Sequence, residues 1–384
     1  MTGALLPGAT IGVMGGGQLG RMLGQAARRL GYGVVVWSPE PQPPAAAVAD
    51  GLVCEPYHNR EAEVAFATAV DVVTFEFENI PADVVERLAT WRPVRPSPQV
   101  LALTQHRGRE KAFLRSAGLP HAPYREVADR AALVPALRAI GYPCVLKTAG
   151  FGYDGKGQVR LRGRRDLGAA RALLDEGPCL LERQVPLRLE VSVVVARAAD
   201  GELAIYPVFE NEHRDHVLDV TVVPARISDE LAAQATRLAV QVAEGLGLVG
   251  LACIECFVDE HGKLLVNEIA PRPHNSGHVS IEACETDQFE QQLRAVCGLP
   301  LGSTRLRSPA AMANLLGDLW DDGTPAFARV LAQPGLHLHL YGKRQARPGR
   351  KMGHLSLLAG DADRADAGVR AARDALRPPA RDVG

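Results

Sequence analysis

Hydrophobic and polar positions alternate along the first hundred residues as they do in βαβ folds. Short apolar runs at 10–14, 34–37 and 70–75 predict buried parallel strands, and the amphipathic stretch 19–30 predicts a helix after the first strand. Helical patterns before and after the third run predict helices that cover the sheet. The pattern therefore predicts a doubly wound α/β domain over residues 1–105.

The pattern changes after the proline-rich stretch WRPVRPSP. Residues 110–117 and 131–140 predict helices and PCVLKT predicts a strand, which together indicate a second domain over 106–184. Longer apolar runs then predict antiparallel pairs, LEVSVVVAR with ELAIYPVFE and LACIECFV with KLLVNEIA. A predicted helix at 229–246 separates them, so residues 185–384 are expected to form an α+β domain.

Composition places the chain among ordinary globular proteins. Its 384 residues suggest two or three domains at about 150 residues each. Lysine and arginine number 43 against 44 acidic residues, which argues against nucleic acid as a partner, so any polyanionic ligand must meet a local basic cluster. A basic leader and an apolar run of about 18 residues are both missing, so neither a signal peptide nor a membrane span is expected.

The cysteines predict a reducing compartment. Seven are scattered singly along the chain, an odd number without a disulfide pattern, so we expect a cytoplasmic protein. The one close pair, Cys253 and Cys256, lies in a predicted strand, where residues three apart point to opposite faces. This placement argues against a metal or redox pair.

A glycine loop follows the first predicted strand. Gly15, Gly17 and Gly20 fit G-x-G-x-x-G between a strand and a helix, and Glu40 follows the second strand as a ribose-binding acid would. The motif alone leaves three interpretations open: a dinucleotide site, a site for another phosphorylated ligand, and a tight turn without a ligand.

A second glycine-rich segment, GFGYDGKGQ at 150–158, lies between two predicted strands, shortly after Lys147. Because strands flank it on both sides, the segment predicts a hairpin flap and not a phosphate loop that opens a helix. Its amides and cation could close over a triphosphate. A solvated turn is the alternative.

Two acidic residues are predicted to oppose each other across a hairpin. If LACIECFV and KLLVNEIA pair through DEHG, opposed residues have numbers that sum to about 522 or 523, which sets Glu255 against Glu268. Opposed carboxylates repel unless a cation lies between them, so the pair predicts a magnesium site to which Asn267 could add an oxygen. A slipped register, or neutralisation by Arg272, is the alternative.

Three further segments are rich in polar side chains. The loop APRPHNSGHVS predicts a site for a small anion or polar substrate, and the cations of YGKRQARPGRKMGH predict a phosphate clamp unless that loop is merely solvated. TFEFENIP ends the third strand, where ligands bind in open α/β sheets. The residues concerned are Arg272, His274, Asn275, Ser276, His278, Lys343, Arg344, Arg347, Arg350, Lys351, Glu76, Glu78 and Asn79.

Together, GGGQLGRML, TFEFENIP, GFGYDGKGQ, LLVNEIAPRPHNSGH and RPGRKMGHL resemble the ATP-grasp superfamily, and within it the 5-(carboxyamino)imidazole ribonucleotide synthase family, over about residues 10–360. The resemblance implies an ATP-grasp fold, of mixed α/β and α+β character, behind an N-terminal Rossmann-like domain. It also implies a cytoplasmic, homodimeric ATP-dependent ligase of purine biosynthesis. In that family ATP and bicarbonate give carboxyphosphate, whose carboxyl group passes to the amine of 5-aminoimidazole ribonucleotide.

The resemblance also implies site residues. The expected ATP site consists of Arg107, Lys147, Gly152, Tyr153, Asp154, Gly155, Lys156, Gly157, Gln158, Glu182, Arg183, Gln184, Val185, Glu190, His213, Asn267 and Glu268. The expected ribonucleotide and bicarbonate site consists of Gln18, Leu19, Glu76, Tyr153, Asp154, Lys156, Arg272, His274, Asn275, Lys343, Arg350 and Lys351. Within these sets Arg272, His274 and Lys351 are expected to be catalytic, with Glu255 and Glu268 on Mg²⁺ and Glu182 to Val185 holding adenine through backbone groups.

One departure and several alternatives accompany the resemblance. Lys156 stands where many relatives have arginine, which keeps the charge but loses bidentate contact. His274 is hypothesised to orient the carboxyl group or to accept a proton. The alternatives are another ATP-grasp ligase such as a formate-dependent one, a nicotinamide oxidoreductase built on the glycine loop, and a non-catalytic nucleotide-binding regulator.

Overall fold

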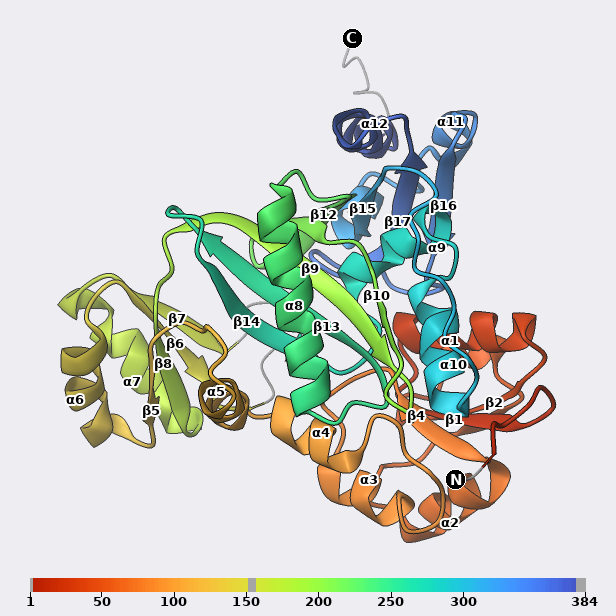
Figure 1. Cartoon of the computed structure of the whole chain (residues 1–384), viewed down its shortest axis with the longest axis horizontal. Helices are drawn as coiled ribbons and strands as arrows, with labels where there is room; N and C mark the ends of the chain where they lie inside the picture. The colour runs from red at the N-terminus through yellow and green to blue at the C-terminus, as the bar shows by residue number, and fades with distance from the viewer. Residues whose placement is uncertain (1–2, 151–156, 378–384) are drawn as a thin grey trace.

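Residues 3–150 and 157–377 are described by the computed structural model, and the strands within them form three sheets. Figure 1 shows the largest sheet at the centre, with a smaller α/β lobe on either side of its lower half. Among the described residues, no helix has both the length and the apolar character that crossing a membrane requires.

The first sheet confirms the predicted doubly wound domain. Its strands are all parallel and lie in the order β3-β2-β1-β4. Helices α2 and α3 cover one face, and α1 together with α10 from much later in the chain covers the other. The elements are β1 (Thr10–Met14), α1 (Gln18–Arg29), β2 (Gly33–Trp37), η1 (Pro44–Val48), β3 (Gly51–Val53), α2 (Arg60–Ala69), β4 (Val72–Phe75), α3 (Ala82–Leu88) and α4 (Pro98–Thr104).

The second sheet is antiparallel, in the order β5-β8-β6-β7, and α6 and α7 pack on one side of it. Strands β6 and β7 pair directly and antiparallel, with Lys147 opposite Gln158, as predicted for the two arms of a hairpin. The elements are α5 (Arg107–Ser116), β5 (Tyr124–Val127), α6 (Arg130–Ile140), β6 (Cys144–Thr148), β7 (Gln158–Leu161), η2 (Arg164–Asp166), α7 (Leu167–Glu176) and β8 (Cys179–Arg183).

The third sheet runs β14-β13-β9-β11-β12-β15-β17-β16, with β10 also paired to β9. Its strands are β9 (Leu187–Arg197), β10 (Leu203–Ile205), β11 (Phe209–Arg214), β12 (Val217–Val223), β13 (Gly250–Asp259), β14 (Leu264–Ala270), β15 (Ala310–Leu316), β16 (Leu336–Leu340) and β17 (Lys351–Leu358). Its helices are α8 (Asp229–Gly245), η3 (Asn275–Val279), α9 (Ser280–Ala283), α10 (Gln288–Cys297), η4 (Gly317–Trp320), α11 (Phe327–Leu331) and α12 (Ala362–Ala375).

One strand of the expected pair is interrupted. The run ELAIYPVFE forms β10 and the start of β11, and both pair with β9. Pro207 lies in the gap, where it has no amide hydrogen to give to a ladder. The segment therefore pairs with β9 in two short pieces and not as one long strand.

The two faces of the central sheet are buried against different helices. Val191, Val193 and Val195 of β9 pack with α8, whereas Val194 and Ala196 pack on the opposite face, beside α9. Cys256 lies in the first cluster and Cys253 in the second, as expected for residues three apart on a strand. The face away from α8 carries the polar residues of the site.

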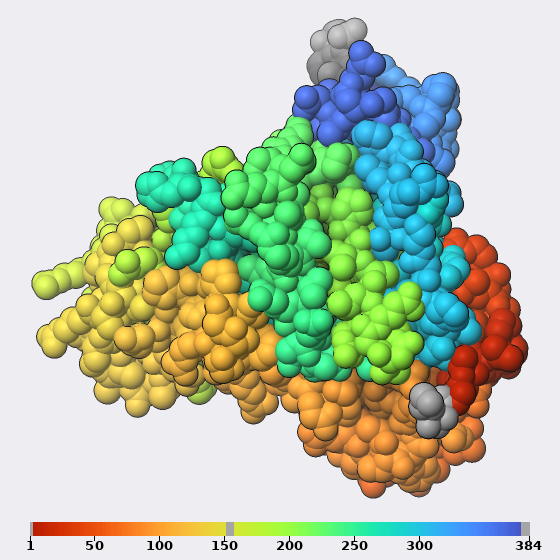
Figure 2. All heavy atoms as spheres, in the orientation of Figure 1, coloured from red at the N-terminus to blue at the C-terminus, as the bar shows by residue number. Residues whose placement is uncertain are grey.

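Helix α10 ties the central sheet to the first domain. Phe289 and Leu293 of α10 are buried together with Ile11 and Val34 of the parallel sheet. Figure 2 shows the red N-terminal residues directly beside the blue segment that holds this helix. The cleft between the two sheets is therefore bounded by elements that share one core.

Candidate active site

The opposed carboxylates lie where the hairpin register predicted them. Glu255 on β13 pairs directly with Glu268 on β14, and the register then shifts so that Cys256 pairs with Val266. Asn267 is therefore the extra residue of a β-bulge, a feature that re-aims side chains beside active sites. The register has not slipped, and the ion pair of Arg272 is with Glu78.

Two cations of the protein's own chain compensate the carboxylates instead. Arg107, at the start of α5, places NH1 3.4 Å from Glu268 Oε2, and His274 Nε2 lies 3.2 Å from Glu255 Oε1. Burial raises the pKa of Glu255, but neighbouring positive groups, His274 foremost, outweigh it and bring the pKa down to about 2. Glu255 is therefore anionic at neutral pH.

A buried acid joins two lysines on the side of the site where ATP is expected. Glu182 at the end of β8 forms an ion pair with Lys147 of β6 and a second one, at 3.0 Å, with Lys111 of α5. Burial raises the pKa of Glu182, and the lysines lower it further than burial raises it. Lys111 also donates to the carbonyl of Asn267 at 2.9 Å, so it links the second sheet to the metal hairpin.

The other residues expected to bind ATP lie in or next to strands β8, β9 and β11 and in the glycine-rich segment. Glu190 on β9 forms an ion pair with His213 on β11, with Nδ1 2.8 Å from Oε2. The amides of Arg183 and Gln184 already donate to the carbonyls of Pro123 and Pro143, so in this conformation these two amides are not available to adenine. Gly152, Tyr153, Asp154, Gly155 and Lys156 lie outside the described residues; Gly157 and Gln158 at the base of the flap lie within them.

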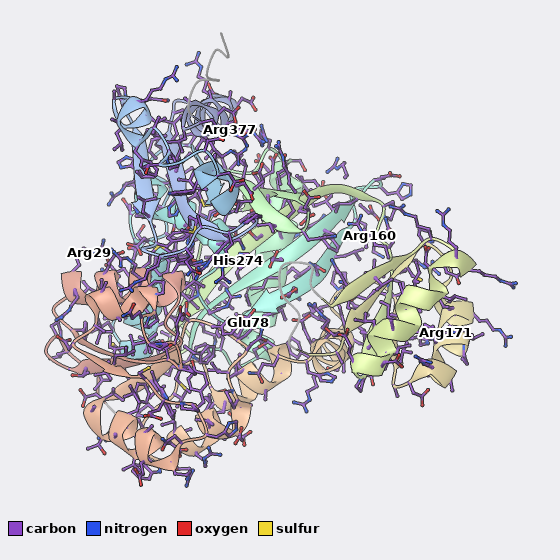
Figure 3. The ribbon with its side chains drawn as sticks, turned by 180° about the vertical axis from the view of Figure 1, so that it is seen from behind. Arg29, Glu78, Arg160, Arg171, His274 and Arg377 are labelled. Atoms are coloured by element: carbon purple, nitrogen blue, oxygen red, sulfur yellow. The ribbon has the colours of Figure 1, made fainter. Side chains whose placement is uncertain are left out.

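The loop after β14 brings Arg272, His274 and Asn275 to the same cleft. Arg272 makes a bidentate ion pair with Glu78, with NH2 2.7 Å from Oε1. Figure 3 shows Glu78 and His274 near the centre of the molecule, at the junction of the first domain and the central sheet. Asn275 is 7% exposed, yet neither its amide nitrogen nor its amide oxygen has a partner among the described residues.

The first glycine loop is filled by a side chain of the protein. Glu76, directly after β4, accepts from the amides of Gly17 at 2.7 Å and Gly20 at 3.0 Å, at the start of α1. A Cβ atom on Gly15 or Gly17 would lie within 3 Å of this side chain. The glycines therefore make room for a carboxylate that occupies the anion-binding end of the helix. A dinucleotide pyrophosphate could not bind there without displacing it.

The basic segment borders the same region. Lys343 donates to the carbonyl of Lys351 at 2.7 Å, and Arg350 donates to the carbonyl of Gln345 at 2.9 Å. Burial raises the pKa of Glu76, and the charges of Arg272 and Lys343 oppose that rise. The basic loop, the Arg272 loop and the end of β4 therefore contribute charge to one site. Gln18 and Leu19 form the first turn of α1 beside Glu76.

Three contributors were missed by sequence reasoning: Lys111, Gln288 and the pairing of Glu78 with Arg272. Gln288 on α10 accepts from the His274 amide at 2.9 Å and donates to the His274 carbonyl at 2.8 Å, which clamps the backbone of that residue. A buried lysine in RGREKAF and a glutamine in DQFEQQ carry no local pattern that marks their partners. His278, expected in the polar loop, is instead fully buried and stacks on His354.

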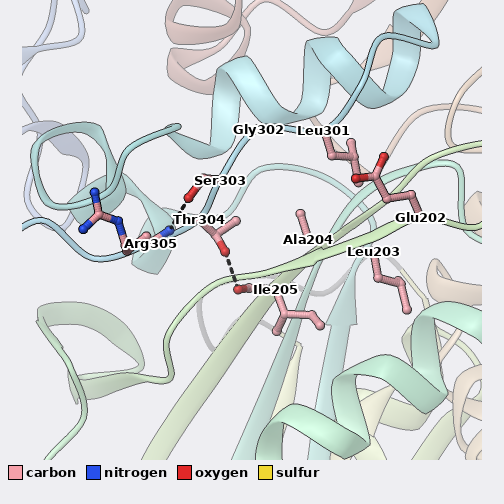
Figure 4. A pocket seen from close by; sticks show the side chains of 9 residues that line it. All are labelled: Glu202, Leu203, Ala204, Ile205, Leu301, Gly302, Ser303, Thr304 and Arg305. Carbon is pink, nitrogen blue, oxygen red and sulfur yellow. Dashed lines mark hydrogen bonds between the residues drawn. The ribbon is translucent and has the colours of Figure 1, made fainter.

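A larger hollow lies away from this site. A pocket of about 460 Å³ lies between residues 202–205 and 301–305 (Figure 4), and it contains none of the predicted residues. A much smaller one of about 20 Å³ borders Glu78, Arg107 and Glu268. We place the site at the smaller pocket, because the charges of Glu78, Arg107 and Glu268 converge there and none of the predicted residues lines the larger hollow.

The carboxylate pair also suits a metal ion. Within residues 3–150 and 157–377, no group of three or more histidine, cysteine or acidic side chains converges as a closed metal site. Mg²⁺ is usually held by one or two carboxylates together with phosphate oxygens and water, so Glu255 and Glu268 fit this ion better than a structural metal.

Comparison with known proteins gives the family. Residues 8–105 match the ribonucleotide synthetase preATP-grasp domain, 112–289 the ATP-grasp domain, and 310–368 the phosphoribosylaminoimidazole carboxylase C-terminal domain. The N5-carboxyaminoimidazole ribonucleotide synthase of Bacillus subtilis strain 168 is 43% identical over 358 residues, which cover 92% of each chain. That of Brucella melitensis is 44% identical over 355 residues, covering 92% of this chain and 97% of the relative.

Solved structures agree. An N5-carboxyaminoimidazole ribonucleotide synthetase in complex with ADP superposes with a TM-score of 0.93 at 43% identity, covering 98% of this chain and all of the other. The Aspergillus clavatus enzyme, in complex with ADP and 5-aminoimidazole ribonucleotide, gives 0.86 at 31% identity, covering 96% and 98%. The fold class and the resemblance expected from the sequence are thereby confirmed. The chain belongs to the N5-carboxyaminoimidazole ribonucleotide synthase family of ATP-grasp ligases.

Proposed function

We propose that this protein carboxylates 5-aminoimidazole ribonucleotide. Bicarbonate oxygen attacks the γ-phosphorus of ATP, ADP leaves, and carboxyphosphate forms. The ribonucleotide amine then attacks the carboxyl carbon, phosphate leaves with the C–O bond electrons, and the amine loses a proton. The products are N5-carboxyaminoimidazole ribonucleotide, ADP and phosphate.

One observation carries the proposal: the opposed carboxylates of Glu255 and Glu268 lie beside the loop after β14, whose His274 contacts Glu255 and whose polar groups could hold a second, anionic substrate. Within that loop the Asn275 amide is buried and unpartnered, which a ligand with both donor and acceptor groups would correct. A simple nucleotide-binding regulator would need the first feature and not the second.

The protein's own groups would do the positioning. Lys147 would neutralise charge on the nucleotide phosphates, and Arg272, whose planar fork is held by Glu78, would present its remaining N–H groups to bicarbonate. Mg²⁺ bound by Glu255 and Glu268 would supply charge neutralisation at the transferred phosphoryl group. Lys343, Arg350 and Lys351 would hold the phosphate of the ribonucleotide.

An ADP-release assay tests the reaction. Purified protein with ATP and Mg²⁺ is expected to release ADP at full rate only when bicarbonate and 5-aminoimidazole ribonucleotide are both present. The product, trapped and identified by mass spectrometry, should contain carbon from labelled bicarbonate. Formate-dependent release, or full release without the ribonucleotide, would contradict the proposal and favour the alternative ligase. Tight NADH binding without ATP binding would favour the oxidoreductase.

The metal assignment has its own test. Glu268→Gln removes one anionic ligand, and we expect turnover to fall by at least about 100-fold, because charge stabilisation dominates phosphoryl transfer. Glu260→Gln changes an exposed acid at the tip of the same hairpin and serves as the control. Circular dichroism checks that both variants are folded. Undiminished turnover in Glu268→Gln would rule out the carboxylate as a metal ligand.

We further propose that the protein acts in the cytoplasm as a homodimer, as the family resemblance implies. Sedimentation analysis at micromolar concentration is expected to give about twice the 41.1 kDa of one chain. A mass of a single chain at that concentration would contradict the dimer.

A further inference from the structure

A continuous line of buried side chains leads from His274 into the central sheet. His274 Nδ1 lies 2.9 Å from Ser276 Oγ, which lies 2.9 Å from Ser192 Oγ. Ser192 Oγ is 2.8 Å from Asn211 Nδ2, and Asn211 Oδ1 is 2.9 Å from Thr221 Oγ1. Ser192, Ser276 and Thr221 are fully buried and Asn211 is 6% exposed, so water does not compete for these bonds.

The line follows from the register of the sheet. Ser192 on β9 pairs directly with Glu255 on β13, so both side chains stand on the same face. Asn211 on β11 pairs directly with Thr221 on β12. The polar row therefore begins at the metal carboxylates and continues across three more strands, under the short helix η3 that carries Ser276.

A backbone amide holds the ring at the same nitrogen. The amide of Ser276 lies 3.3 Å from His274 Nδ1, so Nδ1 meets both the amide and the hydroxyl of one residue. On the other side of the ring, Nε2 lies 3.2 Å from Glu255 Oε1. Further along the line, Ser192 accepts from the Asn211 amide nitrogen, and the Asn211 oxygen accepts from Thr221. The ring is therefore held at both of its nitrogens.

We propose that Ser276, Ser192, Asn211 and Thr221 form a positioning network that orients the ring of His274. The network holds Nδ1 inward, toward η3, so that Nε2 faces Glu255 at the carboxylate edge of the site. Because both ring nitrogens already have partners, this arrangement favours orientation of the carboxyl group over proton acceptance as the role of His274. The inference rests on the proposed function.

Ser192→Ala breaks the network without touching a substrate residue. We expect kcat for bicarbonate-dependent turnover to fall about tenfold, with KM for ATP unchanged, because the nucleotide residues keep their contacts. Ser356→Ala is the matched control: it removes a hydroxyl that is equally buried in the same sheet and has no partner among the described residues. Its kcat should equal that of the unaltered protein.

A second pair of variants tests the network in case Ser192→Ala does not fold. Thr221→Val removes the last donor at nearly constant volume and is expected to lower kcat about threefold, whereas Thr221→Ser keeps the hydroxyl and should restore the rate. If Ser192→Ala and Ser356→Ala gave the same kcat, or if Thr221→Ser behaved as Thr221→Val, the network would have no positioning role.

Nitrogen NMR of histidine-labelled protein reads the ring itself. With the His274 signals assigned through His274→Asn, the Nδ1 resonance should shift in Ser192→Ala but not in Ser356→Ala. An Nδ1 resonance in Ser192→Ala that is the same as in the unaltered protein would overturn the inference. Because this reading needs no substrate, it can fail or succeed independently of the proposed reaction.

Discussion

At the scale of single residues, the glycine loop shows that a motif typical of ligand binding can hold a side chain of the protein itself. Gly17 lets the Glu76 carboxylate approach the start of α1, because a Cβ atom there would lie 2.8 Å from Oε1. Gly17→Ala should displace that carboxylate and cost about 1–2 kcal/mol of unfolding free energy. Gly168→Ala, on the exposed start of α7 with open space around it, should instead add up to about 1 kcal/mol. Urea unfolding measures both, and equal effects would contradict this account of the loop.

Glu182 gives a pH dependence whose sign follows from its surroundings. Its pKa is lowered in the folded protein, so its contribution to stability is complete above the unfolded pKa of about 4.3 and is lost as the pH falls further. Glu182→Gln leaves Lys111 and Lys147 buried together and should cost about 3 kcal/mol at pH 7. The difference from the unaltered protein should narrow when unfolding is repeated near pH 3. A difference that stays constant or widens would show that the lysines are not held by the carboxylate.

Whether a residue of the site could be predicted from the sequence depends on how far along the chain its partner lies. Glu255 and Glu268 could be paired from the sequence because a short hairpin fixes its own register, and the bulge at Asn267 shifted only the residues nearer the turn. Lys111 and Gln288 could not be found, since their partners lie more than ten residues away in the chain, on other elements. Glu76 and Glu78 were expected at the end of a strand, but not the glycine amides and the arginine that hold them.

At the scale of elements, the side chain of Lys111 bridges the two sheets of the ATP-grasp part. It reaches from α5 to Glu182 on β8 and to the bulge of β14. Lys111→Met should cost about 2–4 kcal/mol of stability, because the buried carboxylate and carbonyls lose a charged donor, and it should raise KM for ATP about tenfold. Lys263→Met, at an exposed position beside the hairpin turn, should change stability by less than about 0.5 kcal/mol. An unchanged KM for ATP would show that the contacts of Lys111 do not affect the binding of ATP.

At the scale of the whole molecule, segments that are far apart in the sequence share one hydrophobic core. The pattern of apolar runs separates the first hundred residues from the rest, yet one face of their sheet is covered by α10, nearly two hundred residues later. Periodicity identifies that α10 has an apolar face but not which sheet the face meets, so this packing could not be predicted. Gln292 of α10 also donates to Thr74 of β4 at 2.9 Å, within the same junction.

This shared core predicts that the first domain and the ATP-grasp part unfold together. Leu293→Ala opens a cavity between α10 and the parallel sheet and should cost about 2–5 kcal/mol, in a single transition seen alike by fluorescence and circular dichroism. Leu331→Ala, at a half-exposed position on α11, should cost far less. A fragment of residues 1–105 would lack the cover of α10 and should bind a hydrophobic dye without a cooperative transition. Two separated transitions in Leu293→Ala, or a cooperatively folded fragment, would instead mean that the first domain is stable by itself and that α10 only docks against it.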